Sequence, residues 1–127
     1  MKLLKGSILA SLLVGLITTN SAQQNQQRLE LNLEAPEKLH AVAEQIKQFD
    51  KSRFNQVVRL LGSTDLGGPI RVVLVPEDSR IARDTPSWVA AFADAPNNLI
   101  VLFPSRIGSY PYDSLEAVLR HEVAHIL

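Results

Sequence analysis

Apolar residues recur at helical spacing between residues 36 and 61, at Leu39, Ala43, Ile46, Phe54, Val57, Val58 and Leu61. This period predicts one amphipathic helix, or two helices joined near Asp50. Pro36 suits the first turn of such a segment, and Gly62 suits the residue that ends it. His40 lies within the segment and is expected to be an exposed or partly packed residue, not a metal ligand.

A dense run of β-branched residues, 70–75, predicts a strand. It begins after a Gly-Gly-Pro triplet at 67–69 and ends at Pro76, and residues of these types commonly interrupt regular structure. The polar segment 77–87 follows. It is expected to loop over the surface, with its charged side chains solvated and not catalytic.

Two further apolar runs, 88–93 and 99–103, predict a β-hairpin. The turn-forming residues 94–98 lie between them and indicate a reversal of direction. Trp88, at the start of the first run, is expected to be a core residue or part of a cleft wall. A loop over 104–112 is expected to lead into a final helix.

The first 22 residues have the pattern of a secretory signal peptide. Lys2 and Lys5 precede an apolar run, and small and polar residues follow it up to Ala22, after which cleavage is expected. The apolar run is short for a membrane span, so export to the periplasm or the medium is favoured over an uncleaved anchor. Residues 23–35 are polar and glutamine-rich, and they predict a linker whose alternating leucines form at most a short strand.

These elements are expected to form one small α+β domain over residues 36–127, in which a helix packs on a small mixed sheet and a final helix follows. The chain has 127 residues, of which 46% are hydrophobic and 20% charged, and its formal net charge is zero. Without a basic excess, neither a nucleic-acid partner nor stable membrane insertion after leader cleavage is expected. The absence of cysteine excludes both a disulfide framework and a lipid-bearing leader cysteine. The sequence does not predict an oligomeric state.

The candidate chemistry lies in the final helix, predicted from Ser114 onward, which contains the sequence HEVAH at 121–125. Two imidazoles four residues apart share one face of a helix, so both can bind a single ion. Neutral imidazole suits zinc, and a catalytic zinc usually has three protein ligands and an open position. The spacing therefore predicts that His121 and His125 bind zinc. Glu122, beside that face, is expected to act as a general base toward water.

The alternative for these residues is a solvated surface helix that binds no metal. Apolar residues flank the motif on several sides, at Leu115, Val118, Leu119, Val123, Ile126 and Leu127. A helix buried over much of its circumference makes unbound titratable residues costly, which favours the metal site. Asp113 and Glu116 fit a capping-box pattern with Asp113 as the N-cap. Tyr110 and Tyr112 precede the helix, where a phenol could stabilise an oxyanion, although a packing role is favoured.

A helix, a strand, a hairpin and an HEVAH helix resemble the N-terminal half of the zincin metallopeptidases, in the thermolysin-like branch. Segments 86–93, 98–102 and 115–127 are similar to the peptidase MA-like domains of bacterial exported proteins. The resemblance implies that His121 and His125 are zinc ligands and that Glu122 is the general base and proton shuttle. It also implies a third ligand, a glutamate in a later segment, so the chain is expected to be an incomplete N-terminal subdomain of a longer enzyme.

The resemblance implies zinc-dependent hydrolysis of a peptide or protein substrate. In such folds the strand before the active helix is often an edge to which an extended peptide adds, and Leu99 to Phe103 is the expected edge. Two alternatives stay open. One is a non-catalytic exported binding or scaffold domain, and the other is a metal-dependent hydrolase of a different amide, such as a cell-wall peptide. The HExxH spacing predicts the water-activating residues and not the substrate.

Overall fold

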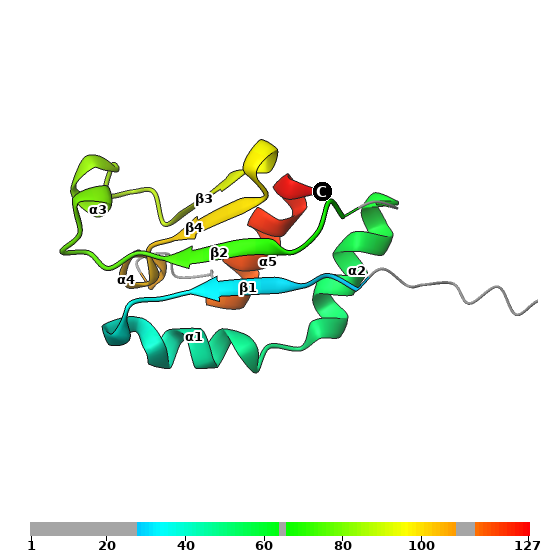
Figure 1. The fold of residues 1–127 in the computed structure, drawn as a ribbon, viewed down its shortest axis with the longest axis horizontal. Helices are drawn as coiled ribbons and strands as arrows, with labels where there is room; N and C mark the ends of the chain where they lie inside the picture. The colour runs from blue at the N-terminus through cyan, green and yellow to red at the C-terminus, as the bar shows by residue number, and fades with distance from the viewer. Residues whose placement is uncertain (1–27, 64–65, 109–113) are drawn as a thin grey trace, which may run out of the picture.

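Four short strands form the centre of the structure, a computed structural model that describes residues 28–63, 66–108 and 114–127. The strands are β1 (Leu31–Glu34), β2 (Ile70–Leu74), β3 (Ala91–Asp94) and β4 (Leu99–Leu102). They lie in the order β1-β2-β4-β3, with β1, β2 and β4 parallel and β3 antiparallel to β4 (Figure 1). The edges of this sheet are therefore β1 and β3.

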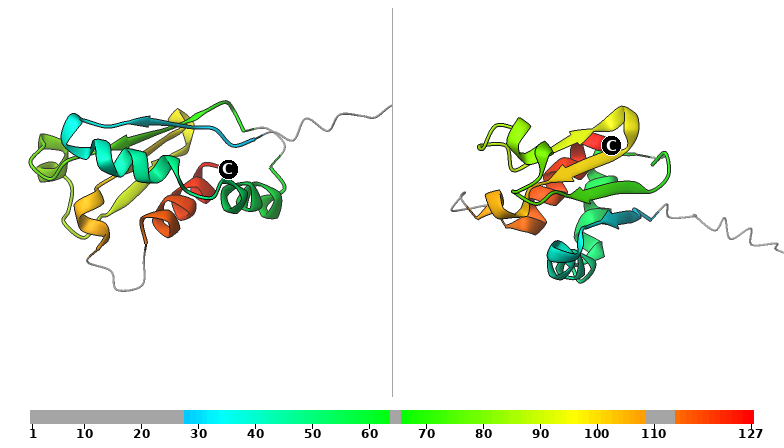
Figure 2. Two further views of the ribbon diagram at one scale, coloured as in Figure 1. Left: turned by 90° about the horizontal axis from the view of Figure 1, so that it is seen from below. Right: turned by 60° about the vertical axis from the view of Figure 1, so that its left-hand side comes forward.

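Three helices cover one face of the sheet (Figure 2). They are α1 (His40–Lys47), α2 (Lys51–Leu61) and α5 (Leu115–Ile126). Residues two apart on a strand face the same side, so alternate strand residues meet the helices. The resulting core contains Ala43, Ile46, Phe54, Ile70, Val72, Leu74, Ile100, Leu102, Leu119 and Val123. The α+β class and the small mixed sheet that the sequence predicts are confirmed.

A second, smaller core lies on the opposite face, at one end of the sheet. It contains Val75, Ala82, Val101 and Phe103. Ala82 belongs to α3 (Arg80–Asp84), a short helix inside segment 77–87, which the sequence predicts as a surface loop. Ser79 begins this helix by accepting a hydrogen bond from the Ala82 N–H at 3.1 Å. The loop prediction is wrong at this point because the segment buries an alanine against the sheet.

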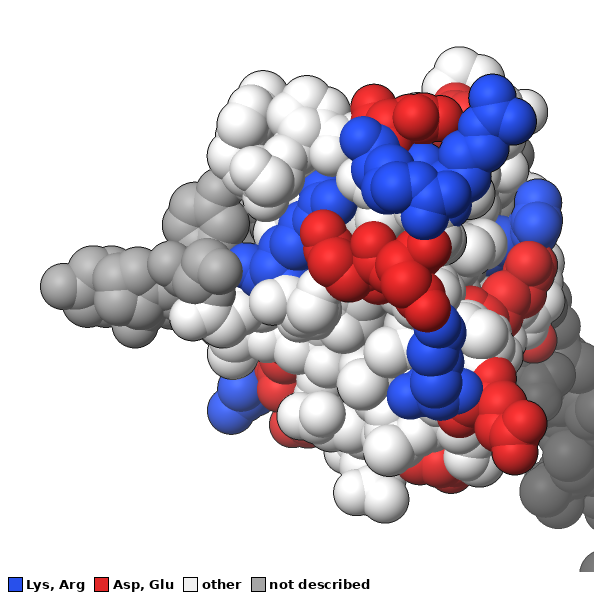
Figure 3. Space-filling model, turned by 90° about the vertical axis from the view of Figure 1, so that its left-hand side faces the viewer, with Lys and Arg blue, Asp and Glu red and all other residues white. Residues whose placement is uncertain are grey.

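The end of the molecule that carries α3 has acidic and basic side chains next to one another (Figure 3). Lys38 forms an ion pair with Asp78, and Arg80 lies 3.4 Å from Asp84 one turn later on α3. These four side chains are more than half exposed. Because these side chains are exposed, this part of the predicted solvated surface is confirmed. Exposed ion pairs of this kind contribute little to stability.

A second predicted loop, 104–112, also begins with a helix. Pro104 occupies the first turn of α4 (Pro104–Ile107), where the missing N–H of proline is not needed. Tyr110, Tyr112 and Asp113, for which the sequence predicts roles near the final helix, lie outside the described residues.

The predicted helical segment between Pro36 and Gly62 is two helices joined near Asp50. A short turn, η1 (Glu37–Leu39), precedes α1. The Asp50 carboxylate accepts a hydrogen bond from the Ser52 N–H at 2.9 Å and begins α2. Gly62 ends α2 with a φ of 63°, a left-handed conformation that glycine adopts without a steric penalty. Of the two alternatives that the sequence left open, the structure has two helices, and the predicted stop at Gly62 is confirmed.

The alternating leucines of the predicted linker 23–35 form β1, as a short strand. Leu31 pairs with Ile70, and Leu33 pairs with Val72. Residues 31–34 therefore belong to the sheet and not to a linker, while residues 1–27, including the predicted leader, lie outside the described residues. Over residues 28–63, 66–108 and 114–127, no helix combines the length and apolarity that crossing a bilayer requires.

The hairpin predicted from its two apolar runs is confirmed, but its order in the sheet differs from the expected one. A second short turn, η2 (Ala95–Asn97), joins β3 to β4, and Asn98 completes it with a φ of 52°. β4 bonds to β2 on one side and to β3 on the other, so Leu99 to Phe103 is an internal strand. The edge strand that packs against α5 is β3.

Candidate metal centre

The helix that carries the candidate site is capped by Ser114. The Ser114 hydroxyl accepts a hydrogen bond from the Ala117 N–H at 3.1 Å, so α5 begins one residue later than the sequence predicts. Ser114 has the capping role that the sequence analysis assigned to Asp113. Glu116 forms an ion pair with Arg53 of α2 at 3.1 Å. This contact joins the first turn of α5 to the neighbouring helix.

Burial around α5 separates the residues of the motif into two groups. Leu119 and Val123 are fully buried in the main core, and Glu122 is only 9% exposed. His121 and His125 are exposed. The helix is therefore fixed to the sheet by its apolar face, while its two imidazoles lie at the surface.

The two imidazoles converge. The Nε2 atoms of His121 and His125 lie 3.0 Å apart, and the ring planes are inclined at 81°. Two nitrogens that bind one zinc ion at about 2.0–2.1 Å in tetrahedral geometry lie about 3.3 Å apart. The observed separation is within a few tenths of an ångström of that value, so this pair of donors suits a zinc ion. The same distance also allows one ring to donate a hydrogen bond to the other.

Other candidate ligands lie elsewhere. Within the ranges 28–63, 66–108 and 114–127, no three His, Cys, Asp or Glu side chains come together in a group that could hold a metal ion. His40 lies on α1, where its Nε2 is 3.6 Å from the Glu44 carboxylate. The structure brings together the two histidines of the motif on α5. The third histidine of the chain, His40, lies on α1, next to Glu44 of the same helix.

A cavity of about 400 Å³ lies beside the motif. Four of its lining residues precede or begin β3 and four belong to α5: Trp88, Val89, Ala90, Ala91, Ala117, Val118, His121 and Glu122. Trp88 is 72% exposed. Of its two predicted roles, the structure therefore places it in the cavity wall and not in the core. Glu122, although buried, is at the cavity surface.

Most of this cavity wall was not predicted from the sequence. Ala117 and Val118 lie four and three residues before His121, so the helical period could have placed them on the same side. Val89 and Ala90 give no such signal, because they reach the cavity only through the pairing of β3 with β4.

The chain matches no protein-family model, and searches of curated proteins and of solved structures return no match either. A function must therefore be inferred from the residues themselves, above all from the geometry of His121, Glu122 and His125.

Proposed function

We propose that this chain carries the metal-binding helix and the general base of a zinc-dependent peptidase. The observation that carries the proposal is the convergence of two imidazole nitrogens, 3.0 Å apart, next to a buried carboxylate that lines a cavity. A solvated surface helix would not require this arrangement. A metal centre with an adjacent proton acceptor does require it.

His121 and His125 would hold the zinc ion through their Nε2 atoms. When bound, zinc supplies Lewis acidity, which acidifies a water molecule and polarises a carbonyl group. A catalytic zinc usually has three protein ligands. These two imidazoles are proposed as part of the set, with a glutamate as the remaining ligand, as the zincin resemblance implies.

Glu122 is proposed to move the proton. One of its carboxylate oxygens would accept a proton from the attacking water, and the carboxylic acid would then donate that proton to the nitrogen of the leaving amine. Because Glu122 is 9% exposed and lines the cavity, its carboxylate would be held in place by its surroundings while it stays accessible to a ligand in the cavity. Its position directly after His121 supports this role.

The position of β3 supports a peptide as the substrate. β3 is an edge strand, and the residues before it line the cavity together with α5. An extended peptide that adds to an edge strand by main-chain hydrogen bonds would run past the cavity. Val89, Ala90, Ala91 and Val118 supply the apolar part of the cavity lining, which suits an apolar side chain near the scissile bond.

Isothermal titration of the 127-residue chain with Zn²⁺ tests the metal centre. One ion is expected to bind per chain, more weakly than at a complete catalytic site, because the two imidazoles supply only two of the usual three ligands. Tight one-to-one binding would show that the chain contributes a further ligand. Failure to bind zinc would contradict the proposal and favour the non-catalytic binding domain.

A further inference from the structure

One arginine is buried behind the cavity wall. Arg106, on α4, is 7% exposed, and its guanidinium carbon lies 4.4 Å from the centroid of the Phe103 ring. A buried cation is costly unless it is paired and its N–H groups are hydrogen-bonded. The partners of Arg106 therefore show how the cost of its burial is offset and which parts of the chain it holds together.

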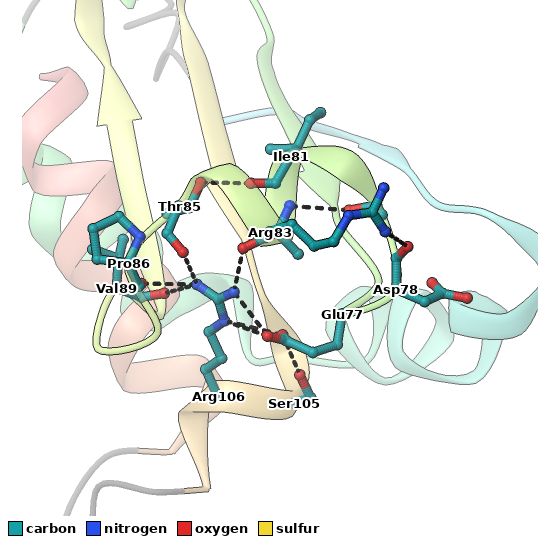
Figure 4. A network of polar contacts seen from close by, with 11 residues as sticks. Glu77, Asp78, Ile81, Arg83, Thr85, Pro86, Val89, Ser105 and Arg106 are labelled. Carbon is teal, nitrogen blue, oxygen red and sulfur yellow. Dashed lines mark hydrogen bonds and ion pairs between the residues drawn. The ribbon is translucent and has the colours of Figure 1, made fainter.

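The Arg106 guanidinium binds one carboxylate and several carbonyl groups of a single segment (Figure 4). Its Nε and Nη2 donate to the Glu77 carboxylate at 3.0 and 2.8 Å. Nη2 also donates to the Ala82 carbonyl at 2.8 Å. Nη1 donates to the carbonyls of Pro86 and Val89 at 2.9 and 3.1 Å. One side chain thus connects the segment that follows β2, the last turn of α3 and the residues that lead into β3.

The segment held by Arg106 continues directly into the cavity wall. Val89 lines the cavity, and its carbonyl is one of the Arg106 acceptors. The next carbonyl, that of Ala90, accepts a hydrogen bond from the Phe103 N–H at 2.9 Å. Arg106 itself does not line the cavity. Any effect that it has on a bound ligand must therefore act through the backbone of the wall.

Glu77 neutralises the buried guanidinium from the surface. The hydrogen bonds from Arg106 lower the pKa of Glu77, and a hydrogen bond from the Ser105 hydroxyl at 3.0 Å acts in the same direction. The neighbouring carboxylate, Asp78, is paired with Lys38, and its backbone carbonyl accepts a hydrogen bond from Arg83. The charges around Glu77 therefore favour its ionised form.

Acid is expected to remove the contribution of Glu77 to stability. A carboxyl whose pKa is lowered by folding stabilises the protein at pH values above its ordinary pKa of 4.5, and this stabilisation is lost as the pH falls through the lowered value. Urea denaturation of the wild type and Glu77→Gln at a series of pH values checks this. The difference in free energy of unfolding should be constant near neutral pH and shrink below 4.5. A difference that persists into strongly acidic solution would contradict it.

We propose that Arg106 is a positioning residue that fixes the cavity wall formed by residues 88–91 opposite Glu122. This inference rests on the proposed peptidase function for its consequence, which is the binding of substrate. Arginine suits the role because its planar fork presents five N–H donors, whereas lysine presents a point charge. Arg106→Lys keeps the positive charge but loses the fork that reaches the carboxylate and the carbonyls together.

Trp88 provides a direct measurement, since it is the one tryptophan in the sequence and lies in this wall. In Arg106→Lys, the fluorescence anisotropy of Trp88 is expected to fall, because Trp88 is already 72% exposed and its mobility, not its accessibility, reports how firmly the wall is held. The dissociation constant of an extended leucine-containing peptide, followed by Trp88 emission, is expected to rise about tenfold, the equivalent of one strong hydrogen-bonded contact. The zinc dissociation constant should stay the same, because His121 and His125 lie on α5.

Arg83→Lys is the matched control. Arg83 is an exposed arginine on α3 that donates to the Asp78 carbonyl at 2.6 Å and does not line the cavity, so none of these measurements should change. If Arg106→Lys does not fold, Glu77→Gln, at a half-exposed position, should give a smaller fall of Trp88 anisotropy.

Unchanged Trp88 anisotropy in a folded Arg106→Lys would overturn the proposal, and so would a parallel loss of zinc affinity, which would indicate general disruption. The Trp88 measurement needs no metal and no peptide. If the wild type binds neither, the proposed peptidase function fails while the positioning of the wall is still decided.

Discussion

Zinc binding is expected to be lost when either His121 or His125 is replaced by alanine. Each residue supplies one of two Nε2 atoms that lie 3.0 Å apart, and a single remaining imidazole cannot chelate the ion. Because these residues would contact the metal directly, the fall in affinity should exceed the loss of about 10- to 100-fold that follows the removal of an outer-shell partner. Isothermal titration with Zn²⁺ and metal analysis of the purified variants measure it.

The third histidine provides the control for this experiment. His40 lies on α1 beside Glu44, and His40→Ala should leave the zinc affinity unchanged. His121 and His125 are exposed, so their replacement should change the free energy of unfolding by no more than about 0.5 kcal/mol. Wild-type zinc affinity in both motif variants would remove the basis of the proposed metal centre.

The convergence of the two imidazoles is the part of the site that the sequence could predict. It follows from a spacing of four residues on a helix, and the helix follows from a local pattern of apolar residues with a cap. The cap itself was assigned to the wrong residue. Ser114 and Asp113 are both good N-cap residues, and a one-residue shift in a helix start cannot be decided from composition alone.

Local rules also predicted the breaks between elements. Asp50 and Gly62 act within one or two residues of their own positions, and Asn98 takes the left-handed conformation that the turn requires. The order of the strands is a different matter. β4 lies between β2 and β3, so its hairpin partner β3 is the edge strand. Which strand of the hairpin pairs with β2 depends on contacts between residues far apart in sequence. The prediction that Leu99 to Phe103 is an edge strand is therefore wrong, because β4 is internal.

The cavity wall and the buried Arg106 could not be predicted from the sequence for the same reason. Arg106 follows Pro104 in a segment that the sequence predicts as a loop, and nothing in that segment predicts a buried guanidinium. Its partners lie between residues 77 and 89, well before it in the chain. A side chain that acts by binding distant carbonyl groups leaves no periodic signal in the sequence. The motif residues are predictable, whereas the surroundings that shape a substrate site are not.

In a zinc-loaded form of the protein that includes the third ligand, turnover is expected to fall by at least about 100-fold in Glu122→Gln, because general acid–base catalysis typically contributes about 10²- to 10⁴-fold. Glutamine has nearly the same shape as glutamate, so the 9% exposed site should remain packed and the two imidazoles should keep their positions. An amide does not take up a proton near neutral pH. Zinc content should therefore be unchanged while hydrolysis of fluorogenic peptides by the zinc-loaded protein is lost.

Glu116→Gln separates this effect from the loss of any carboxylate on α5. Glu116 makes an ion pair with Arg53 and does not line the cavity, so this variant should lose at most about 1 kcal/mol of stability and keep its turnover. If Glu122→Gln also kept near-wild-type turnover with a full complement of zinc, the proton would have to be taken by another group. A selective loss in Glu122→Gln would assign the proton transfer to the buried carboxylate next to His121.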